Sequence, residues 1–534
     1  MLEEYASRLL EGWHPVIAAN RAPVQVHRQG QRFVATRGAG GLVSALSTLA
    51  ASTDAVWVGC ARTDGDREVA AKHPRNFVTL TGDDGRSYRV AFVMPDEEAY
   101  DLYYNNISNP LLWFIQHYLW DLTQEPMLDQ ATDHAWREGY VKVNQQIADR
   151  VVQAARRGEG KRPLVMIQDY QLYLVAAMVR ARLPQATLQQ FVHIPWPTPQ
   201  YWKILPKKMR DPIVEGVLGN DIIGFQTSGD CRNFLLTCED NMGLSVDYRE
   251  QTVFHQGRTI WVRSYPVSID VELFESFAAS EAVRTEQRNI RRWRPEKLIL
   301  RVDRSDPSKN LLRGFAAYDR LLRDHQDLWG KVQLWAFLQP TRQDVPVYRR
   351  YLREVQFVAR ELNQRYSSGG WRPVRLELRE DLARAVAAYK EYDVLLVNSI
   401  YDGMNLVAKE GPMVNERDGV LVLSENAGCY EELGQWAFSI NPFDVDATAD
   451  ALYRALTMEV RQRRARLRHI RETVRTNDIA RWISSQLQDI RDLTGPRWSR
   501  RLPGTTRELV RGVERSRAVS RLLGRQTPAE RGKT

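Results

Sequence analysis

The sequence is poor in cysteine, and this scarcity restricts the kinds of protein it can encode. Its 534 residues contain four cysteines, none of them in a pair spaced like the ligands of a metal site. Four are also too few for the disulfide framework that stabilises small secreted domains. We therefore expect a reducing, cytoplasmic location. The cysteines are Cys60, Cys231, Cys238 and Cys429.

Long hydrophobic runs are also missing. No stretch approaches the roughly 20 apolar residues needed to cross a bilayer. The first residues, MLEEYASRLLEGW, are acidic and amphipathic, unlike a secretory signal. The sequence thus predicts a soluble protein with no membrane partner.

Positive charge is concentrated at one end of the chain. The net charge is +9, yet 497–533 alone holds eleven basic and three acidic residues, a balance of +8. This tail has few large apolar residues, which favours a disordered segment over a folded one. A solvated tail and an anion-docking arm both fit this composition. Because the rest of the chain is nearly neutral, we expect no specific nucleic-acid partner.

Short apolar runs separated by helical patterns fill the body of the chain. Continuous apolar strands that alternate with helices are typical of parallel sheets covered on both faces. Two sets of four runs predict an α/β protein with two Rossmann-like parallel-sheet domains facing each other across a cleft. The first set is 14–21, 163–170, 188–195 and 221–227, and the second is 297–304, 332–339, 393–399 and 419–426.

The length of the chain also favours two domains, because single cores rarely grow beyond 250–300 residues. We place an N-terminal domain at 1–268 and a C-terminal domain at 269–477. A helix at about 478–494 is expected to cross back to the first domain. Residues 495–534 form the basic tail. The sequence is compatible with a homo-oligomer.

Two segments resemble anion sites. RGAGGL (37–42), a glycine-rich turn before a helical pattern, would present backbone amides to a phosphate, although glycine pairs also make ordinary turns. RVDRSDPSKN (301–310) ends a predicted strand, where Arg304 and Lys309 could clamp a diphosphate. Basic residues at strand ends are also often merely solvated.

A third segment, NSIYDGMNLVAKEG (398–411), combines a strand end, a tight turn at Asp402 and the start of a helix. The free amides of that helix could meet sugar hydroxyls or phosphate oxygens. Glu410, about two helical turns after Asp402, can face the same ligand. The plainer interpretation is a surface Asp-Gly turn, which leaves the preceding apolar strand unexplained.

Asp169 and His193 follow two further strands, in QDYQ (168–171) and HIPWPTPQYW (193–202). A carboxylate and an imidazole at the carboxyl ends of parallel strands can hydrogen-bond to sugar hydroxyls. A lone histidine at a strand end is more often structural. The functional interpretation of these two residues therefore depends on the other motifs.

Together these segments resemble the trehalose-6-phosphate synthase family of retaining glycosyltransferases, which have the two-domain GT-B fold. The resemblance runs from residue 20 to about residue 490 and is most specific in DGMNLVAKE (402–410) and HIPWPTP (193–199). YYNNISN (103–109) and LWFIQHY (112–118) support it.

The resemblance implies an N-terminal domain that binds the acceptor, a C-terminal domain that binds the nucleotide sugar, and a reaction without a metal ion or cofactor. It also implies a role for each matching residue. Arg304 and Lys309 would contact the donor diphosphate, Gly41 would close over it, and Glu410 would hold the ribose. The hexose and phosphate of the donor would lie against Asp402, Gly403, Met404, Asn405 and Leu406. His193 would bind donor hydroxyls, and Asp169 acceptor hydroxyls. The acceptor's phosphate would bind Arg21 and Arg342, in a pocket shaped by Tyr104 and Trp113. The catalytic set is thus Asp169, His193, Arg304, Lys309 and Asp402.

The family's reaction would transfer glucose from a nucleoside diphosphate glucose, most simply UDP-glucose, to glucose 6-phosphate with retention of configuration. The sequence departs from the family pattern at Cys60, where an acceptor-side tryptophan is usual, and at Tyr401, where arginine is common. FVHIPWP and YWKILPK resemble the pseudo-glycosyltransferase branch that acts in aminocyclitol biosynthesis. A sister transferase with another phosphorylated acceptor, such as a glucosylglycerol-phosphate synthase, and a non-catalytic sugar-phosphate sensor therefore stay as alternatives.

Overall fold

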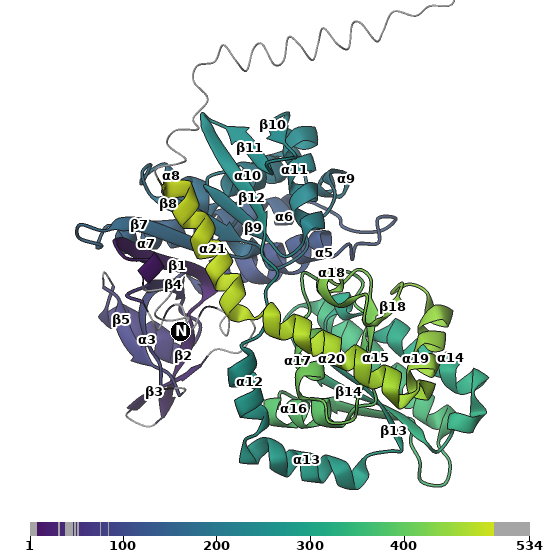
Figure 1. Ribbon diagram of the computed structural model, residues 1–534. Helices are drawn as coiled ribbons and strands as arrows, with labels where there is room; N and C mark the ends of the chain where they lie inside the picture. Colours follow the sequence, from purple (N-terminus) through teal and green to yellow (C-terminus); the bar gives the residue numbers. More distant parts are fainter. Residues whose placement is uncertain are drawn as a thin grey trace, which may run out of the picture. The chain divides into compact units, whose positions relative to one another are not determined.

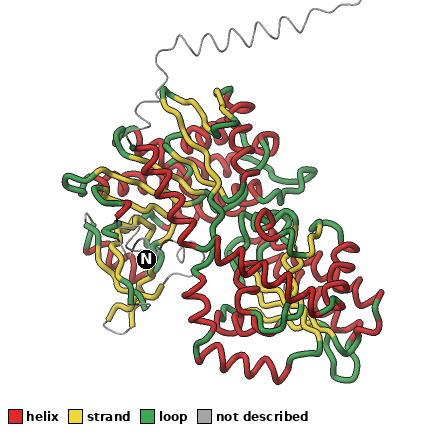
Figure 2. Tube along the Cα trace, viewed as in Figure 1, coloured by secondary structure: helices red, strands yellow, loops and turns green. Residues whose placement is uncertain are grey.

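The computed structural model describes residues 8–29, 32–37, 46, 50, 53–74, 76–83 and 85–495. Two large sheets organise this part of the chain, and helices cover them (Figures 1 and 2). A separate small hairpin joins β2 (Val24–Gln29) and β3 (Arg32–Arg37). The glycine-rich turn with Gly41, and the tail from residue 496, lie outside the described residues.

The first sheet has ten strands. Seven adjacent strands, from β12 to β6 in the sheet, are parallel, and the outer ones run antiparallel. In spatial order the strands are β10 (Ser245–Asp247), β11 (Thr252–His255), β12 (Arg258–Ser264), β9 (Ile222–Phe225), β8 (Thr187–Phe191), β7 (Arg162–Gln168), β1 (Trp13–Arg21), β4 (Val56–Cys60), β6 (Ser87–Val93) and β5 (Val78–Thr81).

The antiparallel edges are the main difference from the parallel sheet that the sequence predicts. A two-residue turn, Gln256–Gly257, joins β11 to β12, and both of its residues have positive φ, as type I′ hairpins require. These edge strands are short and mixed in polarity, so they lack the continuous apolar run that marks a buried strand.

The second sheet has six strands, all parallel. In spatial order they are β15 (Val374–Leu378), β14 (Val332–Gln339), β13 (Lys297–Arg304), β16 (Val394–Val397), β17 (Val420–Ser424) and β18 (Phe438–Ile440). Numbered along the chain this order is 3-2-1-4-5-6, that of a nucleotide-binding Rossmann sheet. The order reverses between β13 and β16, and ligands bind such sheets beyond the carboxyl ends of the strands at that point.

Helices line both sheets. In the first part of the chain they are α3 (Asp64–Lys72), α4 (Glu97–Asp101), η1 (Leu102–Leu112), α5 (Trp113–Gln116), α6 (Gln130–His134), η2 (Ala135–Val141), α7 (Lys142–Ala155), η3 (Tyr170–Leu172), α8 (Val175–Arg180), α9 (Pro199–Trp202), α10 (Lys207–Val217) and α11 (Ser228–Met242). Those that follow are α12 (Val271–Ala278), α13 (Glu281–Trp293), η4 (Pro307–Lys309), α14 (Leu311–Asp324), η5 (Gln326–Leu328), α15 (Pro346–Tyr366), α16 (Leu382–Glu391), α17 (Val407–Val414), α18 (Tyr430–Leu433), α19 (Val445–Thr457), α20 (Val460–Thr476) and α21 (Ile479–Thr494).

Each sheet has its own hydrophobic core. One core gathers apolar side chains of β1, β4, β7, β8 and the helices around them, and the other gathers those of β13, β14, β16 and β17. The eight strands that the sequence predicts are all present, within a few residues at each end. The division at residues 268 and 477 is compatible with these two cores and stays a proposal.

None of the described helices is both long and apolar enough to cross a membrane.

Candidate functional site

Two loops meet where the order of the second sheet reverses. One follows β13 and contains η4, whose first amides are capped by Asp306: its Oδ1 accepts hydrogen bonds from the Ser308 amide at 3.0 Å and the Ser308 hydroxyl at 2.8 Å. The other loop runs from the end of β16 to α17 and contains Ser399, Asp402 and Asn405. Because β13 and β16 are neighbours in the sheet, their carboxyl ends bring these loops together.

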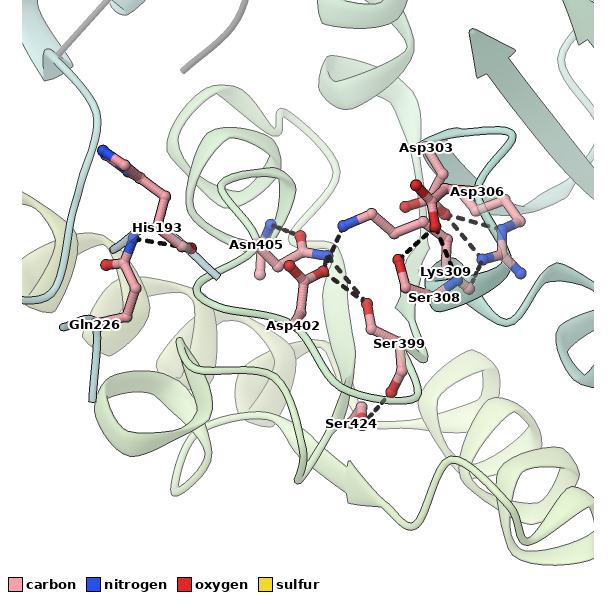
Figure 3. Close-up of polar contacts among 12 residues, drawn as sticks. His193, Gln226, Asp303, Asp306, Ser308, Lys309, Ser399, Asp402, Asn405 and Ser424 are labelled. Atoms are coloured by element: carbon pink, nitrogen blue, oxygen red, sulfur yellow. Dashed lines mark hydrogen bonds and ion pairs between the residues drawn. The ribbon is translucent and has the colours of Figure 1, made fainter. Parts of the chain in front are cut away.

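A buried ion pair joins the two loops. The ammonium of Lys309 contacts Oδ2 of Asp402, and both side chains are almost completely covered (Figure 3). Oδ2 also accepts hydrogen bonds from the Ser399 hydroxyl and from the side-chain amide of Asn405, each at 3.0 Å. Burial alone would raise the pKa of Asp402, but the Lys309 charge outweighs it and lowers that pKa. A fixed cation therefore stands beside a fixed carboxylate at the point where the fold predicts a ligand.

The backbone of His193, which follows a strand of the first sheet, lies close to the loop of Asp402. A Cβ atom on Gly403 would lie 2.0 Å from the carbonyl oxygen of His193, which is two residues beyond β8. Only glycine allows the loop of Asp402 to come this close.

His193 and Asp169 are adjacent, as their positions at the ends of neighbouring strands predict. The His193 amide donates to Asp169 Oδ1 at 3.1 Å, and its ring Nε2 lies 3.1 Å from Gln168 Oε1. Burial lowers the pKa of His193 to about 3, so the imidazole is neutral at physiological pH. Burial also raises the pKa of Asp169 to about 6, against the lowering effect of the His193 amide. The backbone of Asp169 has φ of 72°, which turns the chain sharply after β7.

A cluster of arginines and aromatic rings lies on the other side of η4. The Arg342 guanidinium donates to Asp306 Oδ2 at 2.8 Å and to the Tyr348 hydroxyl at 2.9 Å. It also lies 4.0 Å from the ring centroid of Trp113, over which Arg304 lies at 5.4 Å. The Trp113 indole donates to Asp306 Oδ1 at 3.2 Å. Arg304 and Lys309 thus have different neighbours, one in this cluster and the other at Asp402.

Tyr104 and Arg21 belong to the same cluster. Arg21 ends β1, and its guanidinium donates to the Tyr104 hydroxyl at 3.5 Å. Burial would raise the pKa of Tyr104, but the charges of Arg342, Arg21 and Arg304 lower it. A hydroxyl held among three guanidinium groups marks a place where negative charge is stabilised.

Glu410 lies on α17, with Met404 and Leu406 in the preceding turn. Its Oε2 accepts a hydrogen bond from the Tyr389 hydroxyl at 3.3 Å. Burial raises the pKa of Glu410 to about 7, from an ordinary value of 4.5. The Leu406 carbonyl accepts from the Lys409 and Glu410 amides at 2.9 and 2.8 Å, which closes the first turn of the helix.

The raised pKa of Glu410 gives a pH-dependent stability. Between pH 4.5 and 7 the folded protein binds this proton more tightly than the unfolded chain, so stability falls as pH rises through that window. We expect Glu410→Gln to raise the free energy of unfolding by roughly 3 kcal/mol at pH 8 and by less than about 1 kcal/mol at pH 5. Denaturant unfolding at both pH values measures this. Glu425→Gln, at an exposed position, is the control and should show no such difference. Equal gains at pH 5 and 8 would contradict the assignment.

Several residues of the site were not singled out from the sequence, among them Ser399, Tyr348 and the following three. His117 stacks on Trp113 with ring centroids 4.0 Å apart, and burial lowers its pKa to about 4. Asp306 joins the arginine cluster to η4, and Gln226 donates to the His193 carbonyl at 3.4 Å. His117 and Asp306 stand inside motifs that the sequence does show, so only their contacts had to come from the fold. Among the described residues, no group of three histidine, cysteine or carboxylate side chains could hold a metal ion.

Residues 14–492 match the model of glycosyltransferase family 20. The chain belongs to this family.

Two proteins named for different activities are similar to this chain. A trehalose-6-phosphate synthase of Mycobacterium avium is 32% identical over 495 residues, 90% of this chain and 96% of that protein. A validamine 7-phosphate valienyltransferase of Streptomyces hygroscopicus subsp. jinggangensis is 29% identical over 455 residues, 84% of this chain and 88% of that protein.

Solved structures share the fold as well. A UDP-forming alpha,alpha-trehalose-phosphate synthase of Burkholderia xenovorans, in complex with glucose-6-phosphate, superposes with a TM-score of 0.74. The two chains are 28% identical, and the match covers 90% of this chain and all of that one. The predicted α/β fold class of the GT-B type and the predicted glycosyltransferase activity are thereby confirmed.

Proposed function

We propose that this glycosyltransferase moves glucose from UDP-glucose to glucose 6-phosphate and forms α,α-trehalose 6-phosphate. The observation that carries this proposal is a group of cationic side chains near the ends of β1, β13 and β14 that can bind two anions. Lys309, held by Asp402, and Arg304 suit the donor diphosphate, whereas Arg342 and Arg21, which lie with Arg304 around Trp113 and Tyr104, suit a second anion. A reaction between a nucleoside diphosphate sugar and a sugar phosphate needs sites for both anions.

On the donor side, Lys309 and Arg304 would stabilise the charge that develops on the departing diphosphate. Asp402, with the backbone from Gly403 through Met404 and Asn405 to Leu406, would hold the hexose and its phosphate, and Glu410 the ribose. The neutral imidazole of His193 would bind a donor hydroxyl without adding charge beside the forming oxocarbenium ion. Gly41 keeps its proposed place over the diphosphate, outside the described residues.

On the acceptor side, Arg21 and Arg342 would bind the phosphate, with Tyr104 and Trp113 beside it and Asp169 on the sugar hydroxyls. The bond between the anomeric carbon and the phosphate oxygen of the donor breaks, and the acceptor hydroxyl oxygen bonds to the same face of that carbon, which gives retention. The hydroxyl proton passes to a phosphate oxygen of the leaving nucleoside diphosphate.

A panel of acceptors tests the proposal. Purified protein is incubated with UDP-glucose and, in parallel, glucose 6-phosphate, glucose, glycerol 3-phosphate or validamine 7-phosphate, and products are identified by mass. We expect a hexosyl-hexose phosphate from glucose 6-phosphate at a rate at least about a hundredfold above that with free glucose. Validamine 7-phosphate is included because a similar protein is named for that acceptor. A product from that acceptor alone would replace the proposal with the sister activity.

A substitution at Arg342 tests the acceptor cluster. Arg342→Lys keeps the charge but loses the planar fork, so we expect the KM for glucose 6-phosphate to rise about tenfold or more, with the KM for UDP-glucose nearly unchanged. Arg349→Lys, three residues into α15 and exposed, is the control. If both KM values stay as in the wild type, Arg342 does not bind the acceptor.

A further inference from the structure

The segment that joins the two sheets is held at one residue from both sides. Val267 lies between the end of β12 and the start of α12 and is buried. Its amide donates to Gln226 Oε1 at 2.9 Å, and its carbonyl oxygen accepts from Lys409 Nζ at 2.9 Å. Gln226 follows β9 of the first sheet, whereas Lys409 lies on α17 of the second. Both backbone groups of one connector residue are therefore bound by side chains from different sheets.

Each of these residues is also linked to the candidate site, Gln226 by a hydrogen bond and Lys409 through its helix. Gln226 donates through its amide to the His193 carbonyl, the same oxygen that Gly403 packs against (Figure 3). Lys409 directly precedes Glu410 on the same helix. A movement of α17 or of the His193 loop would thus be transmitted to Val267.

Lys409 is fixed by a buried ion pair as well. Its side chain is 1% exposed, and Nζ lies 2.5 Å from Glu432 Oε2. The other carboxylate oxygen of Glu432 accepts a hydrogen bond from the side-chain amide of Asn477 at 2.9 Å. Asn477 lies between α20 and α21, and two residues later the Ile479 amide donates to the Ile269 carbonyl at 3.0 Å. The segment between α20 and α21 is thus linked, through Glu432, to the same lysine.

We propose that Val267 is the pivot between the two sheets, and that Lys409 is a positioning residue that fixes this pivot relative to the helix carrying Glu410. This inference rests on the proposed function, because the two substrates must meet with their reacting atoms aligned. Lys409 touches neither substrate: it acts through the connector. A misalignment of about 1 Å can lower the rate of such a reaction by about a hundredfold.

The test uses a double variant, because removing Lys409 alone would leave Glu432 buried without a partner. In Lys409→Met with Glu432→Gln, we expect kcat for transfer to glucose 6-phosphate to fall at least about tenfold. The KM for UDP-glucose and its slow hydrolysis without acceptor should stay within about threefold, because the donor contacts are intact. A merely structural defect would lower hydrolysis and transfer together, and that result would overturn the proposal.

Hydrogen exchange of the connector is a second measurement and needs no substrate. We expect the amides of 265–270 to exchange at least about tenfold faster in the double variant, because the Val267 clamp is lost. Lys390→Met with Glu416→Gln is the matched control: Lys390 also pairs with a glutamate, at 3.0 Å, and contacts a backbone carbonyl, that of Ala278 at 3.4 Å. It should leave exchange at 265–270 and transfer unchanged.

Unchanged exchange at 265–270 in the Lys409 double variant would overturn the pivot. If the double variant does not fold, Gln226→Met, which removes the other half of the Val267 clamp, is measured in the same way, and wild-type exchange and transfer in that protein would overturn it equally. Failure of the wild type to make a disaccharide phosphate would refute the proposed function, whereas the exchange result would still decide the pivot.

Discussion

Replacing Lys309 with alanine should lower turnover at saturating UDP-glucose by at least about a hundredfold, the usual cost of removing a group that stabilises developing charge. The ammonium is buried against Asp402, so its field is little screened. Its effect is largest when the diphosphate departs, so the KM for glucose 6-phosphate should change much less. Steady-state kinetics with each substrate varied in turn measures both values.

The control for Lys309 is Lys297→Ala, at the opposite end of the same strand. It should retain activity within about twofold. The loss of Lys309 also leaves Asp402 without its cation, so thermal unfolding must be compared for the two variants. A folded Lys309→Ala protein with wild-type turnover would remove Lys309 from the mechanism.

Gly403→Ala should be nearly as damaging, although it adds only one methyl group. The new Cβ would lie 2.0 Å from the His193 carbonyl oxygen, and neither backbone can move without displacing Asp402 or His193. We expect activity to fall by about a hundredfold, because displacements near 1 Å at a reacting centre have effects of that size. Assays of transfer, with circular dichroism to check the fold, measure this.

Gly229→Ala is the matched control for that substitution. Its Cβ would meet nothing nearer than the Thr227 hydroxyl at 3.7 Å, which is ordinary contact. Activity within about fivefold of the wild type for Gly403→Ala would mean that the two loops do not need their close approach.

Much of the fold could be predicted from local patterns. The buried parallel strands, such as β13 and β14, are continuous apolar runs, and their predicted bounds agree with the structure. The antiparallel edge strands β10 and β11 could not be found in this way, because half-exposed strands of three or four residues carry no such run.

The sequence by itself determined the two-sheet α/β class, the strand ends that carry polar side chains, and the motifs that show the family. It also placed Asp169, His193, Lys309 and Asp402 at those ends. Only the tertiary structure decided which of them touch: Lys309 pairs with Asp402, while Arg304 joins Trp113 and Arg342. It alone disclosed His117, Gln226 and the clamp at Val267. The physical reason is that hydrophobic periodicity is a local property of the chain, whereas contacts between side chains of different elements depend on strand order and on how closely two backbones pack.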